Sequence, residues 1–402
     1  MNFQTKDWAY PEDNATRDLR LDFMRGFVIP LLIVSHFDYF SLFMYVGWER
    51  IGVISTAEIF VTLAGIVIGM VYGKKLKKDG FDACLSALLS RAAQLYRVNV
   101  FIILCIGFLR YVPFIDTTAV TTFHDPYRGI DYPLYPSVND GIFRLLSSAL
   151  MLRCGPHQFQ VVGLYVVLFA LVTPLIFWML EKKHIKLLLG LSWVLYLINF
   201  GMPESQVATA EIRWTGAQFE YAFPLIAWQL VYIHGVVAGY YKKELLDFFK
   251  EGCGNIMIYN AFFISFCFIL FTLNHPIKEF AEWSKLSLIS PETFENLYFN
   301  YFQKYKIGPG RLINTVALFI SIYAVLTRYW QPFNRAFGWI LIPLGQASLY
   351  VFFIHIFLLL LVSNTPFPGY HNFFINTTIH FLVLTLIWIM VKTQFLFRWI
   401  PR

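Results

Sequence analysis

The chain alternates long apolar runs with short polar segments. A transmembrane helix needs about 20 consecutive, mostly apolar residues, and ten runs near this length follow one another along the sequence. The pattern predicts an all-α polytopic membrane protein with about ten transmembrane helices. The fifth run is the shortest. The predicted limits are 21–43, 54–73, 93–113, 159–180, 187–200, 222–241, 256–273, 312–328, 339–362 and 375–392.

Composition agrees with this fold class. Of the 402 residues, 57% are hydrophobic and 14% are charged, whereas soluble domains average about 25% charged residues. We expect membrane lipids to surround the protein. The net charge of +7 follows from basic loops, so nucleic acid is not an expected partner. The five cysteines have neither paired nor metal-like spacing, and no metal site is predicted.

Lysine and arginine residues set the predicted orientation, because cytoplasmic loops are enriched in both. With the N-terminus inside, the inner segments hold about twice as many of these residues as the outer ones, so both termini are predicted to be cytoplasmic. Long outer loops are expected at about 114–158, 201–221 and 274–311 of a single integral-membrane domain, 1–402. The end of the first loop, Ile142–Leu152, has the pattern of an amphipathic interfacial helix.

The first apolar run carries three ionisable residues, Asp22, Arg25 and His36. Such groups are expensive inside a membrane and typically mark a functional path. Positions eleven apart return to nearly the same face of a helix, so Arg25 and His36 share one stripe, about 16 Å apart along the axis. Asp22 lies one turn below Arg25, where an ion pair can form. Pro30 between them is expected to kink the helix.

Further polar residues fall at a similar outer depth in separate runs. Titratable and amide groups that meet in one cavity are candidates for acid–base chemistry. Basic residues near the inner side, Arg20, Arg25 and Lys74 among them, suit an anionic molecule entering from the cytosol. The residues predicted to converge at the outer depth are His36, Glu58, His157, Gln229 and His355.

Simpler roles stay open for several of these residues. Glu58 could be only the structural partner of a nearby arginine or histidine, and Asp22 with Arg25 could be a structural ion pair. His355 could link two helices by a hydrogen bond. Trp228 could be a core or interface aromatic rather than a platform for a sugar. A transporter of a glycan or lipid precursor could also use a stripe of Asp, Arg and His.

Several segments resemble one known family. Their motifs are similar to those of the osmoregulated periplasmic glucan succinyltransferases (the OpgC-like family), within the larger membrane acyltransferase-3 superfamily. The superfamily signature is an arginine followed by ten residues and a histidine, which Arg25 and His36 match. The segments that carry the resemblance are 17–26, 57–65 with Gly69, Phe223-Pro224 with Trp228-Gln229, and 345–349.

The resemblance implies O-acylation of a glycan on the outer face of a bacterial inner membrane. The donor would be a cytosolic acyl-CoA, succinyl-CoA or acetyl-CoA, and the acceptor a glycan hydroxyl, with a homodimer left open. His36 would act as general base or as covalent acyl carrier. The proposed catalytic residues are His36, Glu58 and His355. The proposed donor-binding residues are Asp22, Arg25, Arg20 and Lys74, and those for the acceptor are His157, Trp228 and Gln229.

Overall fold

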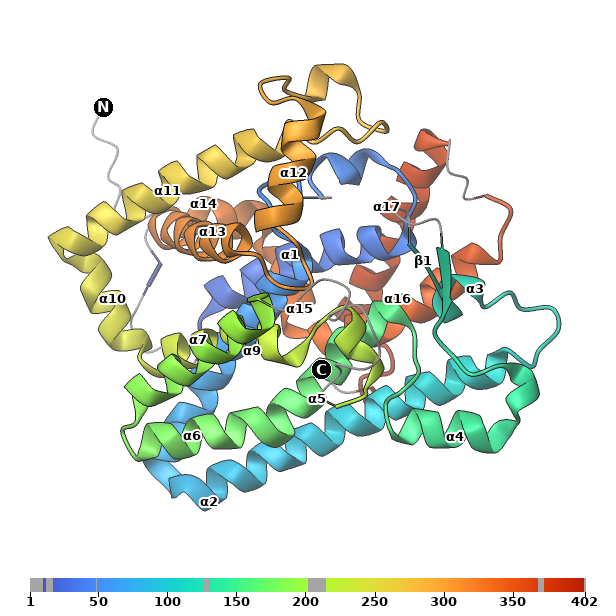
Figure 1. Ribbon diagram of the computed structural model, residues 1–402, viewed down its shortest axis with the longest axis horizontal. Coiled ribbons are helices and arrows are strands. Elements are labelled where there is room, and N and C mark those ends of the chain that lie inside the picture. The colour runs from blue at the N-terminus through green and yellow to red at the C-terminus, as the bar shows by residue number, and fades with distance from the viewer. Residues whose placement is uncertain are drawn as a thin grey trace. The chain divides into compact units, whose positions relative to one another are not determined.

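The computed structural model is mostly helical (Figure 1). It describes residues 10–11, 17–47, 49–125, 130–201, 215–367 and 372–400. The predicted outer loop at 201–221 lies largely outside the described residues, because 202–214 are among those not described. The longer helices are α1 (Leu19–Phe37), α2 (Thr56–Leu109), α7 (Ile185–Gly201), α9 (Leu225–Tyr240), α11 (Gly252–Thr272), α13 (Pro309–Arg328), α16 (Ser348–Ser363) and α17 (Phe373–Lys392).

Shorter helices connect the long ones. Two of them, α5 and α6, join through a π-helical turn into one run, as do α14 and α15. The short helices are α3 (Thr118–Thr121), α4 (Ile142–Leu150), α5 (Gln160–Val167), α6 (Thr173–Glu181), α10 (Lys242–Lys250), α12 (Pro291–Tyr301), α14 (Trp330–Phe333) and α15 (Trp339–Gln346).

Within the described residues, five helical runs are long and apolar enough to cross a membrane, and a sixth is a bent pair. This agrees with the predicted helical membrane protein. α1 is not among them, because its 19 residues include the charged Arg20, Asp22 and Arg25. The ten spans and the cytoplasmic termini stay predictions. The five runs are α2, His157–Glu181, α11, α13 and α17, and the bent pair is Trp330–Gln346 with Ser348–Ser363.

Helix α2 contains two of the predicted spans, because it folds back at Gly80. Gly80 has φ 83°, a conformation that glycine adopts without strain. On a straight helix, residues twelve apart are separated by about 18 Å. Here the Cys84 thiol lies 3.7 Å from the Tyr72 carbonyl oxygen. The runs predicted at 54–73 and 93–113 are therefore the two arms of one helical hairpin.

The predicted span 339–362 is not straight. Helices α15 and α16 meet at an angle of 85°, with Ala347 between them in a non-helical conformation. The bend follows a close approach of α15 to α1, since a Cβ atom on Gly345 would lie 1.9 Å from the Asp22 carbonyl oxygen. Gly26 of α1 makes the reciprocal contact, 1.8 Å from the Leu341 carbonyl oxygen. The two glycines allow backbone contact that larger residues would prevent.

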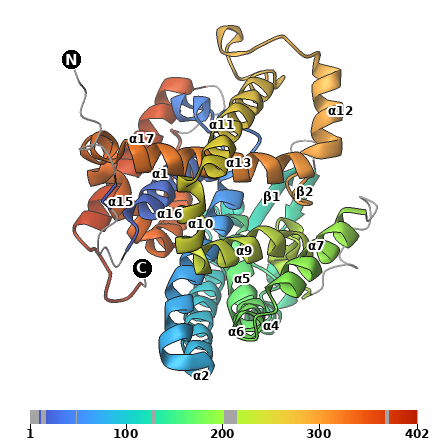
Figure 2. The same ribbon diagram turned by 90° about the vertical axis from the view of Figure 1, so that its left-hand side faces the viewer.

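The chain forms two compact units. The first consists of Met1–Leu63, Tyr241–Val351 and Pro368–Arg402, and the second of Ala64–Tyr240 and Phe352–Phe367. In the first unit α1 packs on α15, and α11 lies along α13 (Figures 1 and 2). A small hydrophobic core beside the end of α1 is formed by Val34, Phe40, Met44 and Phe280.

In the second unit α7 pairs with α9 (Figure 1). The small residues predicted to allow close helix approach do so, because a Cβ on Gly69 would lie 2.0 Å from the Val236 carbonyl oxygen. The all-α prediction needs one correction: strands β1 (Thr122–Asp125) and β2 (Ile130–Pro133) form an antiparallel hairpin in the first long loop. Alternation over four residues is too short a signal to distinguish such strands from loop.

The segment predicted as an interfacial helix is helical. Helix α4 buries Leu145 and Ala149, and it exposes Phe143 by 84% and Met151, just beyond its end, by 58%. Apolar residues that the protein itself leaves uncovered are typical of a helix lying at a membrane surface. α11 is similarly exposed, with Phe263 at 67%.

Candidate active site

The charged end of α1 is buried and already ion-paired. Asp22 is 3% exposed and accepts hydrogen bonds from Arg17 at 2.5 and 2.8 Å. Arg25 lies 4.0 Å from the same carboxylate, one turn along the helix as predicted. Gln346, at the end of α15, donates to it at 3.4 Å. The Asp22 carboxylate therefore collects donors from the segment before α1, from α1 itself and from the bend between α15 and α16.

Arg20 anchors the first turn of α1. It is 1% exposed, donates to both Asp18 carboxylate oxygens at 2.9 Å and to the Thr327 hydroxyl at 2.7 Å. Its guanidinium lies between the rings of Tyr10 and Tyr323, 4.0 and 4.3 Å from their centroids. Every guanidinium nitrogen of Arg20 thus has a partner within the protein.

Asp18 is the centre of this anchor. It also accepts from Lys242 at 2.6 Å and from the Tyr323 hydroxyl at 2.8 Å. Burial alone would raise the pKa of Asp18, but the hydrogen bond and charge of Arg20, with the charge of Lys242, lower the pKa to about 2. The carboxylate therefore stays ionised at any physiological pH.

His36 occupies the last turn of α1 and is half-buried. α1 is helical through Pro30, so Arg25 and His36 lie on one helix. The residue after His36, Phe37, packs edge-on against His380 of α17, with ring centroids 5.7 Å apart. His380 is 1% exposed, and its Nδ1 lies 2.8 Å from the Ser41 hydroxyl. A second histidine, in a run that sequence reasoning treated as purely apolar, thus packs against the last residue of α1.

Glu58 has an arginine partner. Its side chain is fully buried, one oxygen accepts from Arg311 at 2.8 Å, and the other accepts from the backbone N–H of Ser55 at 2.9 Å and from the Ser55 hydroxyl. The structural partnership that the sequence left open for Glu58 is therefore present. It joins the start of α2 to the start of α13.

Arg311 was missed as a site residue because it counted only as an outer-loop arginine. It opens α13, directly after Pro309-Gly310, a common helix start. Besides Glu58, Arg311 donates to Glu49, to the Tyr298 hydroxyl at 2.9 Å and to the backbone carbonyl of Phe302. The Pro-Gly signal could have placed this arginine inside a helix, but its partners are distant in sequence.

The remaining predicted site residues belong to the second unit. Gln229 accepts from the Ser192 hydroxyl at 2.7 Å and donates to the Ser192 and Ile226 carbonyl oxygens at 2.9 and 3.0 Å, which links α9 to α7. Trp228 is fully buried against Phe223, with ring centroids 4.7 Å apart, as the core alternative expected.

The second unit also holds the two other predicted histidines and Lys74. His157 is half-buried and contacts the Phe123 ring at 5.4 Å. His355 is fully buried in α16 beside Phe352, with ring centroids 5.9 Å apart. Lys74 is exposed on the first arm of α2. Since His36 and Glu58 lie in the first unit and His157, Gln229 and His355 in the second, their convergence in one chamber stays a prediction.

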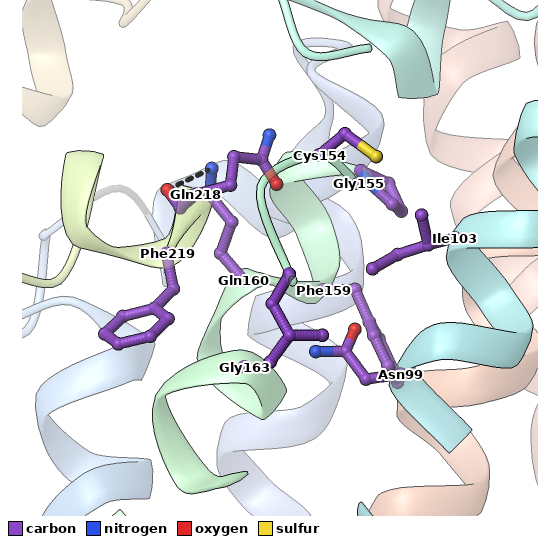
Figure 3. Close-up of a pocket in the computed structure, with 11 residues that line it drawn as sticks. Asn99, Ile103, Cys154, Gly155, Phe159, Gln160, Gly163, Gln218 and Phe219 are labelled. Atoms are coloured by element: carbon purple, nitrogen blue, oxygen red, sulfur yellow. Dashed lines mark hydrogen bonds between the residues drawn. The ribbon is translucent and has the colours of Figure 1, made fainter. Parts of the chain in front are cut away.

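A small polar pocket in the second unit is lined by Asn99, Cys154, Gln160 and Gln218 (Figure 3). Its cavity is about 10 Å³, which holds about one water molecule and no sugar. Burial raises the pKa of the Cys154 thiol to about 12, so Cys154 is not activated as a nucleophile. Across the described residues, no three His, Cys, Asp or Glu side chains are arranged to hold a metal ion.

Comparison with known proteins identified a family. The family model described as OpgC protein matches residues 17–399, nearly the whole chain. The matched range includes Arg25, His36, Glu58 and Arg311. No curated protein matches, and no solved structure matches.

Proposed function

Since the chain belongs to the OpgC family, we propose that it is an integral-membrane O-acyltransferase. It transfers a succinyl or acetyl group from a cytosolic acyl-CoA to a hydroxyl of a glycan on the outer face of the bacterial inner membrane. The acceptor that the family favours is an osmoregulated periplasmic glucan. The match over residues 17–399 carries this proposal, and the Arg25–His36 spacing further supports a place within the acyltransferase-3 superfamily.

The reaction needs a base where the acceptor hydroxyl meets the thioester carbonyl. His36 suits this role, because it is a half-buried imidazole on α1, and histidine is the side chain that enzymes use most often as a general base. It accepts the hydroxyl proton as the oxygen attacks the carbonyl carbon. The carbon–sulfur bond then breaks, and the protonated imidazole returns the proton to the departing thiolate. The products are the acylated glycan and free CoA thiol.

The inner end of α1 suits the donor. Arg25 is 14% exposed at its side chain and only 4.0 Å from Asp22, so it can retain Asp22 as an orienting partner while contacting a phosphate of the donor. Lys74 adds an exposed cation for the same purpose. Arg20 is already saturated by Asp18 and Thr327, and its role in this proposal is to hold α1 in place.

The remaining candidates have less direct roles. Glu58 acts through Arg311 as a positioning residue that fixes the loop between α1 and α2. His355 would donate a hydrogen bond to the oxyanion that forms at the carbonyl. His157, Trp228 and Gln229 stay candidates for the acceptor side. Gln229 also holds α9 against α7 through its hydrogen bonds with Ser192.

Substitution of His36 tests the proposal directly. In proteoliposomes supplied with acyl-CoA and an unsubstituted periplasmic glucan, His36→Ala should lower transfer by about 10²- to 10⁴-fold, the range typical of general acid–base groups. The matched control is His124→Ala, which removes an exposed imidazole from β1. Mass spectrometry of the glucan reports both the added group and its amount. A folded His36→Ala protein that acylates the glucan at the wild-type rate would refute the assignment.

A further inference from the structure

Helix α17 presents three polar side chains to the segment that follows α1. His380 lies four positions after Asn376 and three after Thr377, so the three residues share one face of the helix. α17 packs against α1 and against the 3₁₀ turn Leu42–Tyr45 (Figure 1). Polar residues are expensive in a helix that can cross a membrane, so their partners indicate what they do here.

Two of the three side chains bind backbone groups of a non-helical segment. Asn376 donates to the Phe40 carbonyl oxygen at 3.1 Å, and the Thr377 hydroxyl accepts from the Leu42 N–H at 3.1 Å. Backbone groups outside helices and strands need such partners where water is excluded. These two hydrogen bonds explain Asn376 and Thr377 by structure alone.

His380 differs from them because it binds a side chain. Its Nδ1 lies 2.8 Å from the Ser41 hydroxyl, and both residues are buried, with 1% of His380 and 0% of Ser41 exposed. Its Nε2 has no partner among the described residues. Within the part of the chain that the structure describes, the contact with Ser41 is therefore the one hydrogen bond that fixes the imidazole ring.

Three aromatic rings around the end of α1 contact the ring of His380. Phe37 and Phe43 meet it edge-on, with centroids 5.7 and 6.3 Å away, and Tyr39 is stacked at 6.5 Å. Phe37 is the last residue of α1 and directly follows His36. The His380 ring thus contacts the chain from the last turn of α1 to the turn beyond it.

The last turn of α1 depends on contacts of this kind. The final four carbonyl groups of a helix lack partners within the helix, and helix ends fray. Beyond Phe37 the chain leaves the helix through Asp38, whose φ of 53° is a left-handed conformation that few residues other than glycine, asparagine and aspartate adopt. The position of His36 therefore depends on contacts beyond the helix, several of which α17 supplies.

We infer that His380, through its hydrogen bond to Ser41, is a positioning residue for His36. It holds the end of α1 so that the base meets the acceptor hydroxyl and the thioester carbonyl in a reactive geometry. The inference rests on the proposed acyl transfer with His36 as the base. A catalytic group misplaced by about 1 Å can lose about a hundredfold in rate. Ser41 is fully buried, and neither it nor His380 touches a substrate in this role.

Three variants separate the hydrogen bond from the ring contacts. Ser41→Ala removes only the hydroxyl, His380→Phe keeps an aromatic ring without Nδ1, and His380→Asn keeps a hydrogen-bonding group without the ring. In proteoliposomes supplied with acyl-CoA and glucan, Ser41→Ala and His380→Phe should lower kcat by about tenfold to a hundredfold and leave the KM for acyl-CoA unchanged. His380→Asn should retain more activity than His380→Phe.

The pH dependence distinguishes positioning from proton transfer. The acidic limb of the pH profile of kcat/KM reports the pKa of the essential base in the free enzyme. With His36 as the base, this limb should stay in place in His380→Phe, because the imidazole that is lost does not carry the reacting proton. A limb that disappears in a folded His380→Phe protein would overturn the inference and make His380 itself the titrating group.

The matched control is Ser265→Ala, which removes one hydroxyl of a buried pair that links α11 to α13, where Ser265 and Ser321 are 3.2 Å apart. It should lower the melting temperature, as Ser41→Ala does, and leave kcat unchanged. If His380→Phe does not fold, Ser41→Ala still decides the question. Folded Ser41→Ala protein with the kcat of wild type would overturn the inference.

Hydrogen exchange of the purified full chain separates this inference from the proposed function. Peptides that cover the end of α1 through residue 45 should exchange up to about tenfold faster in Ser41→Ala and His380→Phe than in wild type. Ser265→Ala should leave these peptides unchanged. If wild type transfers no acyl group, the proposed function fails. The role of His380 in holding the end of α1 then stands if exchange there is faster in its variants, and fails if exchange is the same.

Discussion

The ion pair of Glu58 with Arg311 provides the sharpest test of how the start of α2 is held. Both side chains are fully buried, and they join α2 to α13 at 2.8 Å. We consider the variants Glu58→Met, Arg311→Met and the double variant, in which unbranched apolar side chains replace the charges at modest change in volume.

The three variants should differ in a definite order. Removing one partner of a buried pair costs about 3 to 5 kcal/mol, because it leaves a buried charge uncompensated. Arg311→Met should reach this range, since it removes the cation that pairs with both Glu58 and Glu49. Glu58→Met should cost less, about 1 to 3 kcal/mol, because Arg311 keeps Glu49, Tyr298 and Phe302. The double variant should cost about 1 to 3 kcal/mol less than the sum.

Unfolding of the detergent-solubilised proteins by titration with sodium dodecyl sulfate, followed by tryptophan fluorescence, gives the four free energies of the cycle. The control cycle uses Lys75 and Asp79 on α2, which form a half-exposed pair at 3.3 Å. An exposed pair at this helical spacing couples by only about 0.3 to 0.5 kcal/mol. Additive costs for Glu58 and Arg311, within the error of the control cycle, would refute the structural reasoning.

The ion pair of Glu58 with Arg311 also leads to a prediction about catalysis. If Glu58 acts through Arg311, Glu58→Gln should lower activity together with stability, and the acidic limb of the pH–rate profile should stay where wild type has it. A carboxylate that tuned His36 directly would instead shift that limb when its charge is removed. A shifted acidic limb in the pH–rate profile of a stable Glu58→Gln protein would show that Glu58 acts directly on the reacting groups.

Three further predictions concern other parts of the chain. Gly26→Ala should cost about 1 to 3 kcal/mol of stability, because its Cβ would lie 1.8 Å from the Leu341 carbonyl oxygen. The control is Gly190→Ala, since a Cβ on Gly190 would have nothing within 4 Å. An equal loss of stability in both variants would contradict the close packing of α1 on α15. The Asp18 pKa of about 2 lies below its ordinary value of 3.8. Its contribution to the free energy of unfolding, about 2 kcal/mol, should therefore be complete above pH 4 and be lost as the pH falls through 2. Acid unfolding of Asp18→Asn should lack this component, and identical pH profiles for the variant and wild type would disprove the prediction. Maleimide should label the exposed Cys253 well before the buried Cys154, whose pKa is raised to about 12, and mass spectrometry showing early modification of Cys154 would contradict its burial.

The positions of the helices could be predicted because lipid imposes a simple pattern on the sequence. A helix satisfies its backbone groups internally, so a long apolar run has few other options. The runs predicted at 312–328 and 375–392 correspond closely to α13 and α17. The bend between α15 and α16 was not predictable in this way, because it depends on the contact of Gly345 with Asp22, over three hundred residues away in sequence.

Partnerships of the polar residues were predictable only where they are local. The contact of Asp22 with Arg25 follows from their spacing on one helix. Glu58 and Arg311 are 253 residues apart, and a sequence without an alignment gives no sign that they meet. His380 was missed for a related reason: one histidine in an apolar run is equally compatible with a helix contact and with a site.

Two of the buried arginines, Arg311 and Arg50, show why burial and charge must be considered together. Arg311 has enough acceptors to explain its burial by structure alone. Arg50 has fewer partners among the described residues, since its Nε and Nη1 lack acceptors although the side chain is 5% exposed. The cost of burying this charge is offset in part by the Phe280 ring, 4.5 Å from the guanidinium, and by the Ser284 carbonyl oxygen.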